Sequence, residues 1–243
     1  MNIETFITLG YYISSIGFLA ASIITLLAVR KFGKSALGSI FSYLFIGTVI
    51  FFVITIFQKL GGDFFKISHE SVDIWWHIMF YMALIFYYCG LKFLVGLGST
   101  ETDSNQGVQV GAEKKWGILA LILLVVIFII PSWAESIMIG YDSSPLGQLG
   151  LHHFLAFILS GIVGSYLFSA KKNLGQIGRA IANPMIVAVW ALSIQHLWEL
   201  STESWKVIEV TGDNIEGVEK IFLIIASISI AYAAWRLKSF AKA

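Results

Sequence analysis

Charged residues and cysteine are scarce in this sequence. Only 13% of the 243 residues are Asp, Glu, Lys or Arg, which is about half the share found in soluble domains. Cys89 is the single cysteine, so an internal disulfide is excluded. The formal net charge is +1, and without a basic helical face the sequence argues against a nucleic-acid partner.

Long apolar runs take the place of the missing charges. Hydrophobic residues make up 57% of the chain, and the mean hydropathy is +0.81. A helix of about 20 apolar residues crosses the ~30 Å hydrocarbon layer of a bilayer. Seven segments reach this length, at approximately 6–29, 38–58, 72–97, 116–139, 146–170, 183–203 and 218–238. The sequence therefore predicts an all-α integral membrane protein, in which residues 1–243 form a single bundle of seven transmembrane helices.

Proline is also rare, with three residues in the chain. Pro145 and Pro184 each follow a capping residue, which predicts that each stands at the first position of a helix. Pro131 is expected to kink the fourth span near one end, because it removes a backbone hydrogen bond. Segment 98–115 is polar, contains glycine and has no periodicity, so we expect a flexible loop. Trp76 is expected to anchor the third span in the membrane interface.

The basic residues predict an orientation for the seven spans. Twelve of the 16 lysines and arginines lie after the first, third and fifth spans or at the C-terminus. Basic residues concentrate on the cytoplasmic side of membrane proteins. We therefore expect the N-terminus outside, and both loop 98–115 and the C-terminus in the cytoplasm. Twelve of the 15 acidic residues fall on the opposite side, and the expected location is the plasma (inner) membrane.

All five histidines lie in the outer half of this predicted topology. Four of them are inside spans: His77 in the third, His152 and His153 in the fifth, and His196 in the sixth. At ~1.5 Å of rise per residue, these positions come to a similar depth, on the order of 10 Å below the outer boundary. Three helices thus offer imidazoles at one level of the membrane.

Carboxylates accompany these histidines. Asp73 precedes His77 by four residues and Glu199 follows His196 by three, so each acid shares a helix face with its histidine. Glu135 lies just after the predicted kink of the fourth span, which would turn it toward the bundle. Ionisable side chains at this depth are costly and usually face the bundle interior, where they mark functional sites.

His152 and His153 are adjacent and therefore lie ~100° apart around their helix. They are not expected to point at one centre in the same way. His153 shares its face with Ser160, Gly161 and Gly164, and small residues allow close contact between membrane helices. We expect His153 to be the inward residue of the two.

Imidazoles mixed with carboxylates predict a transition-metal site for copper, iron or zinc. The candidate ligands are His77, His152, His153, His196, Asp73, Glu135 and Glu199. Of these, His77, His153 and His196 are expected to bind directly. Glu199 is expected to be a fourth ligand or a catalytic acid/base, Glu135 a bridging catalytic carboxylate, and Asp73 a partner that orients His77. Such a site would face the external or periplasmic side and support redox or metal-dependent chemistry.

Two other functions fit the same residues. Two of the histidines could bind a b-type haem for electron transfer, with Gly161 and Gly164 leaving space for the porphyrin. The chain could instead bind cations without catalysis, as a transporter, a sensor or an accessory subunit that has other membrane subunits as partners. A further alternative is that the histidines have no functional role and only form hydrogen bonds between helices.

Two known classes of seven-span proteins require residues that this sequence lacks, and both are therefore excluded. Retinal proteins need a lysine in the middle of the last span, but residues 221–235 contain none and Lys220 stands at the helix mouth. Zinc hydrolases related to ceramidases and adiponectin receptors pair histidines four residues apart in the last span. No histidine lies in 218–238 here.

Overall fold

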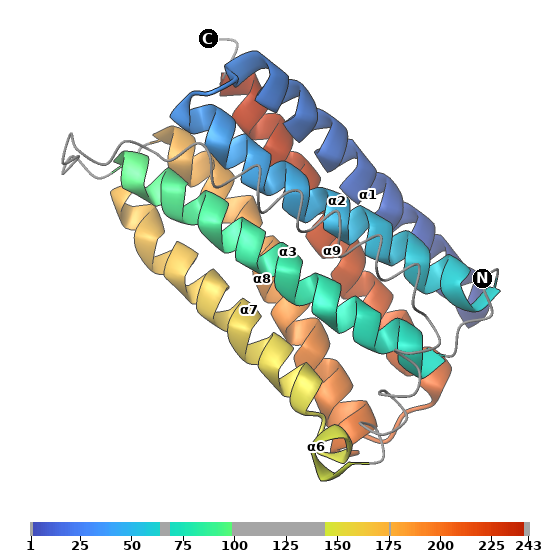
Figure 1. The fold of residues 1–243 in the computed structure, drawn as a ribbon. Helices are drawn as coiled ribbons and strands as arrows, with labels where there is room; N and C mark the ends of the chain where they lie inside the picture. Colours follow the sequence, from blue (N-terminus) through green and yellow to red (C-terminus); the bar gives the residue numbers. More distant parts are fainter. Residues whose placement is uncertain (1, 64–68, 99–143, 175, 241–243) are drawn as a thin grey trace.

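The structure of the chain is a computed structural model that describes residues 2–63, 69–98, 144–174 and 176–240 (Figure 1). Every regular element in these ranges is helical. The long helices are α1 (Ile3–Phe32), α2 (Ala36–Asp63), α3 (His69–Gly98), α7 (Leu151–Ala170), α8 (Gln176–Glu199) and α9 (Gly212–Phe240). The short elements are α6 (Pro145–Gln148), a 3-10 helix η1 (Lys171–Asn173) and a π-helix η2 (Leu200–Ser204).

Six of the described helices are long and apolar enough to cross a membrane. They coincide with six of the seven predicted spans. The fourth predicted span, 116–139, lies outside the described residues, together with Pro131, Glu135 and all but the first residue of the predicted loop 98–115.

The six long helices form a closed ring. Each packs against the next in the order α1, α2, α3, α7, α8, α9, and α9 packs back against α1 (Figure 1). Helices α3 and α7 run in the same direction, because His77 lies beside His153 near their starts and Tyr88 lies beside Tyr166 farther along. The end of α3 and the start of α6 are therefore at opposite ends of the bundle.

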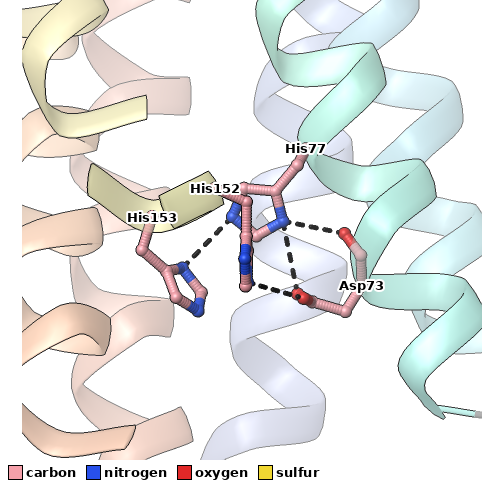
Figure 2. Close-up of side chains that lie close together, drawn as sticks. All are labelled: Asp73, His77, His152 and His153. Atoms are coloured by element: carbon pink, nitrogen blue, oxygen red, sulfur yellow. Dashed lines mark hydrogen bonds and ion pairs between the residues drawn. The ribbon is translucent and has the colours of Figure 1, made fainter. Parts of the chain in front are cut away.

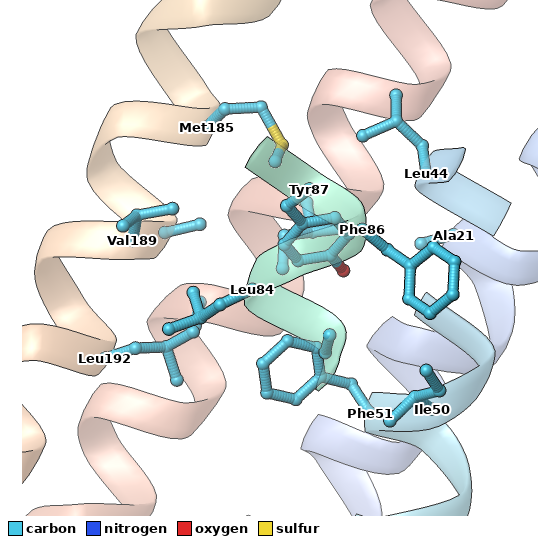
Figure 3. Packing of buried hydrophobic residues seen from close by; sticks show 14 of the residues in the cluster. Ala21, Leu44, Ile50, Phe51, Leu84, Phe86, Tyr87, Met185, Val189 and Leu192 are labelled. Carbon is cyan, nitrogen blue, oxygen red and sulfur yellow. The ribbon is translucent and has the colours of Figure 1, made fainter. Parts of the chain in front are cut away.

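Buried aromatic and aliphatic side chains fill the bundle interior. Phe51 of α2 stacks on Phe18 of α1, with ring centroids 5.0 Å apart, and on Tyr87 of α3 at 5.7 Å. Figure 3 shows side chains of α3 between those of α2 on one side and those of α8 on the other. The third span thus carries its histidine in a densely packed helix.

Three local predictions differ from the structure. Pro184 lies inside α8, which begins at Gln176. A proline within a membrane helix removes one hydrogen bond, and neighbouring groups in the bundle can compensate for it. The fifth span is interrupted after its predicted start because Gly150 has a φ of 66°, which separates α6 from α7. Trp76 is buried in the core, 1% exposed, and is not an interface anchor.

Close packing of α1 against α9 depends on glycine, which gives a testable prediction. A Cβ atom on Gly17 would lie 2.6 Å from Oγ and 2.8 Å from Cβ of Ser227. Because overpacking costs about 1–3 kcal/mol, we expect Gly17→Leu to lower the free energy of unfolding by that amount. Thermal unfolding in detergent measures the change. Ile16→Leu is the matched control, because Ile16 is outward-facing. Equal melting temperatures for the two variants would contradict the predicted contact.

Candidate metal centre

Four histidines from three helices meet at one end of the bundle. His77 comes from α3, His152 and His153 from the first turn of α7, and His196 from the last turn of α8. The ring centroid of His77 lies 4.6 Å from that of His152, 4.8 Å from that of His153 and 5.2 Å from that of His196. Figure 2 shows His152 and His153 approaching His77 from the facing helix.

His77 has one nitrogen committed to its own helix and one directed across the bundle. Its Nδ1 lies 2.9 Å from the backbone carbonyl oxygen of Asp73 (Figure 2). A carbonyl only accepts hydrogen bonds, so Nδ1 carries the proton and donates it, which leaves the lone pair on Nε2. Nε2 lies 3.2 Å from Nδ1 of His153. The bond to Asp73 therefore orients the ring in the way that metal-ligating histidines are commonly held.

Glu199 is the buried carboxylate of the cluster. Its Oε2 lies 2.6 Å from Nδ1 of His196 and 3.0 Å from Nδ1 of His153. Its Oε1 accepts a hydrogen bond of 2.9 Å from the amide of Gln195. Gln195 was not among the residues predicted from the sequence, although its position four residues before Glu199 places both on one helix face. One carboxylate thus links two histidines from different helices.

His196 leaves one nitrogen unused. The side chain is fully buried, and its ring packs against Phe80 with centroids 4.4 Å apart. Nε2 of His196 has no hydrogen-bond partner among the described residues. A buried polar atom without a partner costs about 1–3 kcal/mol, and a ligand bound at this nitrogen would remove that cost.

Two overlapping sets of side chains could hold a metal ion. In the first set, one ligand atom from each of His77, His153, His196 and Glu199 lies within 4.8 Å of the others, and all four residues are buried. The second set meets the same limit and consists of Asp73, His77, His152 and His153. Three imidazoles with one carboxylate form a donor set that suits zinc, iron or copper.

Six of the seven candidate ligands from the sequence analysis thus belong to these two sets, and Glu135 lies outside the described residues. Their role as ligands stays a prediction. His153 is buried and His152 is partly exposed, as the small-residue face suggested. However, both rings contact His77, since two adjacent side chains can reach one neighbour from different sides.

A polar cavity of ≈ 500 Å³ adjoins the cluster. Its wall on the histidine side includes Asp73, His152, His153 and Glu199. The opposite wall belongs to α1 and α9 and includes Tyr11, Glu216, Glu219 and Lys220. The cavity therefore lies between the candidate metal centre and a second group of charged side chains.

Lys220 lies inside the bundle. This differs from the prediction from the sequence, which placed it at the end of the last span. It is 1% exposed, and its Nζ lies 3.7 Å from Oε1 of Glu216 and 3.8 Å from Oε2 of Glu219. The ammonium group also lies over the ring of Tyr11, 4.1 Å from the centroid. Gly10 makes this position possible, because a Cβ there would lie 2.6 Å from Cβ of Lys220.

The fold and the site together define the class of this protein. In the part of the chain that the structure describes, it is an all-helical, membrane-like protein with a buried histidine–glutamate cluster that could bind a metal ion. Comparisons with protein-family models, with curated proteins and with solved structures found no match for the chain.

Proposed function

We propose that this chain is an integral membrane metalloprotein that binds one ion of copper, iron or zinc and uses it for redox or other metal-dependent chemistry. The ligands are His77, His153, His196 and Glu199. The observation that carries this proposal is the gathering of four buried donor atoms within 4.8 Å of one another. Nε2 of His196, which has no hydrogen-bond partner among the described residues, also supports it, because most buried polar atoms in folded proteins are hydrogen-bonded.

The residues around the ion have separable roles in this proposal. His77 is held by the hydrogen bond from its Nδ1–H to Asp73, so Nε2 stays directed at the ion. Glu199 neutralises part of the metal charge and, because it also lines the cavity, can accept a proton from a bound substrate. The ion itself would supply Lewis acidity or electron transfer.

The cavity supports a small polar substrate. Its ≈ 500 Å³ falls within the range of small-molecule pockets. Nε1 of Trp76 and Oε1 of Gln58 are buried, and neither has a hydrogen-bond partner in the described part of the chain. Both residues line the cavity. A small polar molecule in the cavity would therefore lie beside both side chains.

The haem alternative gains no support from this geometry. Two histidines that bind one haem iron from opposite sides sit about 4 Å apart at their nitrogens, because metal–imidazole bonds are ~2.0–2.1 Å long, and the porphyrin lies between them. Here Nε2 of His77 and Nδ1 of His153 are 3.2 Å apart in direct contact. Cation binding without catalysis remains the second candidate function, and the carboxylate-rich cavity favours it. Association with other membrane subunits stays a prediction.

We further propose seven spans, with the N-terminus outside and the metal centre in the outer leaflet. Helices α1 and α9 run in parallel, because Gly10 packs against Lys220 and Gly17 against Ser227. Helices α3 and α7 are parallel as well. Because α3 ends and α7 begins at opposite ends of the bundle, a fourth span at 116–139 would connect them, and this supports the proposal of seven spans. The distribution of basic residues supports the orientation.

Reporter fusions test this topology. We expect a reporter that is active only in the cytoplasm to work at the C-terminus and to fail at the N-terminus, and a reporter active only outside to show the reverse. The same pair of reporters at residue 34, between α1 and α2, is the internal control and should give the cytoplasmic result. Two termini on the same side would contradict the seven-span proposal.

Elemental analysis of the detergent-purified protein, together with its absorption spectrum, tests the proposed function. We expect about one transition metal ion per chain and no haem absorption. Protein stripped with a chelator should take up one equivalent of Co²⁺ and show the visible bands of a nitrogen- and oxygen-ligated ion. Protein that retains no metal and takes up no Co²⁺ would contradict the proposal. A Soret band would favour the haem function over the proposed metal-ion function.

A further inference from the structure

The two candidate ligand sets lie at different depths. They share His77 and His153 and differ in their remaining members. Asp73 and His152 have side chains that are 30% and 16% exposed. His196 and Glu199, by contrast, are 0% and 6% exposed. The two residues found only in the second set are therefore partly exposed, and the two found only in the first are buried, although Glu199 lines the cavity.

The polar cavity reaches only part of the cluster. Asp73, His152, His153 and Glu199 line it, whereas His77 and His196 are not among its lining residues. An ion that enters through the cavity therefore meets Asp73, His152, His153 and Glu199 before it can reach His196.

The charge of the cavity favours the entry of cations. Among the described residues that line it, five are carboxylates and one is a lysine: Asp73, Glu199, Glu203, Glu216, Glu219 and Lys220. Glu203 and Glu216 are the most exposed of the acids, at 48% and 39%. A cleft lined by one sign of charge raises the local concentration of counter-ions and their rate of association.

We propose that Asp73, His77, His152 and His153 form an entry position, from which the metal ion moves to the buried position at His77, His153, His196 and Glu199. This inference rests on the proposed function. In the move, the ion keeps its bonds to His77 and His153, loses those to Asp73 and His152, and gains those to Glu199 and His196. Two bonds break and two form, each set contains one carboxylate, and the oxidation state of the ion does not change.

The ion moves only a short distance in this exchange. Nδ1 of His153 lies 3.2 Å from Nε2 of His77 and 3.0 Å from Oε2 of Glu199. Glu199 itself lines the cavity, so its carboxylate can approach the ion while His153 still holds it. His153 thus binds the ion throughout the transfer.

The two positions are occupied in succession and not together. Nδ1 of His77 is committed as a donor to the backbone oxygen of Asp73, so His77 has a single nitrogen, Nε2, to offer. One nitrogen lone pair cannot bind two ions at once. The shared His77 therefore predicts one ion per chain, with the entry position empty when the buried position is filled.

Stopped-flow measurement of Co²⁺ uptake by metal-free protein tests this proposal. Asp73→Asn and His152→Gln each remove an entry ligand, and Asp73→Asn retains the backbone oxygen that orients His77. We expect each variant to take up Co²⁺ about tenfold more slowly or worse, within the range over which charged clefts alter association rates. At equilibrium, each should bind one Co²⁺ with the spectrum of the unmodified protein. Glu209→Gln is the control, because Glu209 is exposed and does not line the cavity.

A complementary variant removes the buried position. The double substitution His196→Ala/Glu199→Gln should leave the ion at the entry position, with fast uptake, weaker binding and a changed visible spectrum. Far-ultraviolet circular dichroism confirms that each variant keeps its helices before uptake is compared.

The outcomes separate the two proposals. No Co²⁺ uptake by the unmodified protein would overturn the proposed function. One Co²⁺ per chain, with unchanged uptake rates in Asp73→Asn and His152→Gln, would overturn the entry position and leave the proposed function standing. The entry position would also be overturned by two Co²⁺ per chain, or by a changed final spectrum in these variants, because Asp73 and His152 would then be permanent ligands.

Discussion

Replacing His153 with alanine is expected to abolish stoichiometric metal binding. His153 belongs to both candidate ligand sets, and its Nδ1 lies between Nε2 of His77 and Oε2 of Glu199. Changes to partners that only orient a ligand already weaken metal affinity by about 10–100-fold. Loss of a ligand shared by both sets should weaken it by more than ~100-fold. Titration of metal-free protein against a competing chelator measures the change.

Ser160→Ala is the matched control for this experiment. Ser160 is a buried polar residue of the same helix, and its hydroxyl donates to the backbone oxygen of Ala156 and not to the cluster. We expect this variant to bind metal as the unmodified protein does. Similar losses of affinity in His153→Ala and Ser160→Ala would mean that general disturbance of α7, and not removal of a ligand, lowers binding.

Replacing Glu199 with alanine is expected to destabilise the metal-free protein by about 3–5 kcal/mol, the usual cost of removing one partner from a buried charged pair. The Glu199 carboxylate accepts hydrogen bonds from His153, His196 and Gln195. Its removal leaves the His196 imidazole and the Gln195 amide without this acceptor in the interior, and His153 keeps only its 3.2 Å contact with Nε2 of His77. Unfolding in detergent, followed by circular dichroism with increasing denaturant, gives the free energy.

Glu199→Gln separates charge from hydrogen bonding in this comparison. The amide oxygen of glutamine still accepts a hydrogen bond, so we expect a loss smaller than that in Glu199→Ala. Glu209→Ala, at an exposed position between η2 and α9, should change the free energy of unfolding by less than ~0.5 kcal/mol. A loss in Glu199→Ala as small as that in Glu209→Ala would contradict the buried network.

The membrane spans follow from the sequence because the thickness of a bilayer sets the length of an apolar helix. The gathering of His77, His153 and His196 follows from the same argument, since residue number along a span gives depth directly. Proline and glycine residues predicted the ends of the helices less well. Pro184 suggested a helix start but lies within α8, and Gly150 interrupts the fifth span without any signal beyond its residue type.

The lateral order of the helices could not be predicted from depth alone. Depth says nothing about which spans are neighbours, and the contact between α1 and α9 depends on Gly10 and Gly17, whose role becomes visible only in the folded bundle. For this reason, the sequence predicts Lys220 at the end of a helix and does not predict its neighbours. To predict that Lys220 is buried next to Tyr11 and the cavity, one must know which helix lies opposite it.

X-ray absorption spectroscopy of the protein loaded with one equivalent of Zn²⁺ tests the central claim most directly, because it reports the atoms bound to the ion. The account predicts a first shell of nitrogen and oxygen at ~2.0–2.2 Å, with outer-shell scattering from three imidazole rings that falls to two in His196→Ala. A shell of water oxygens without imidazole scattering, or a shell that is unchanged in His196→Ala, would contradict the assignment of the buried histidines as ligands.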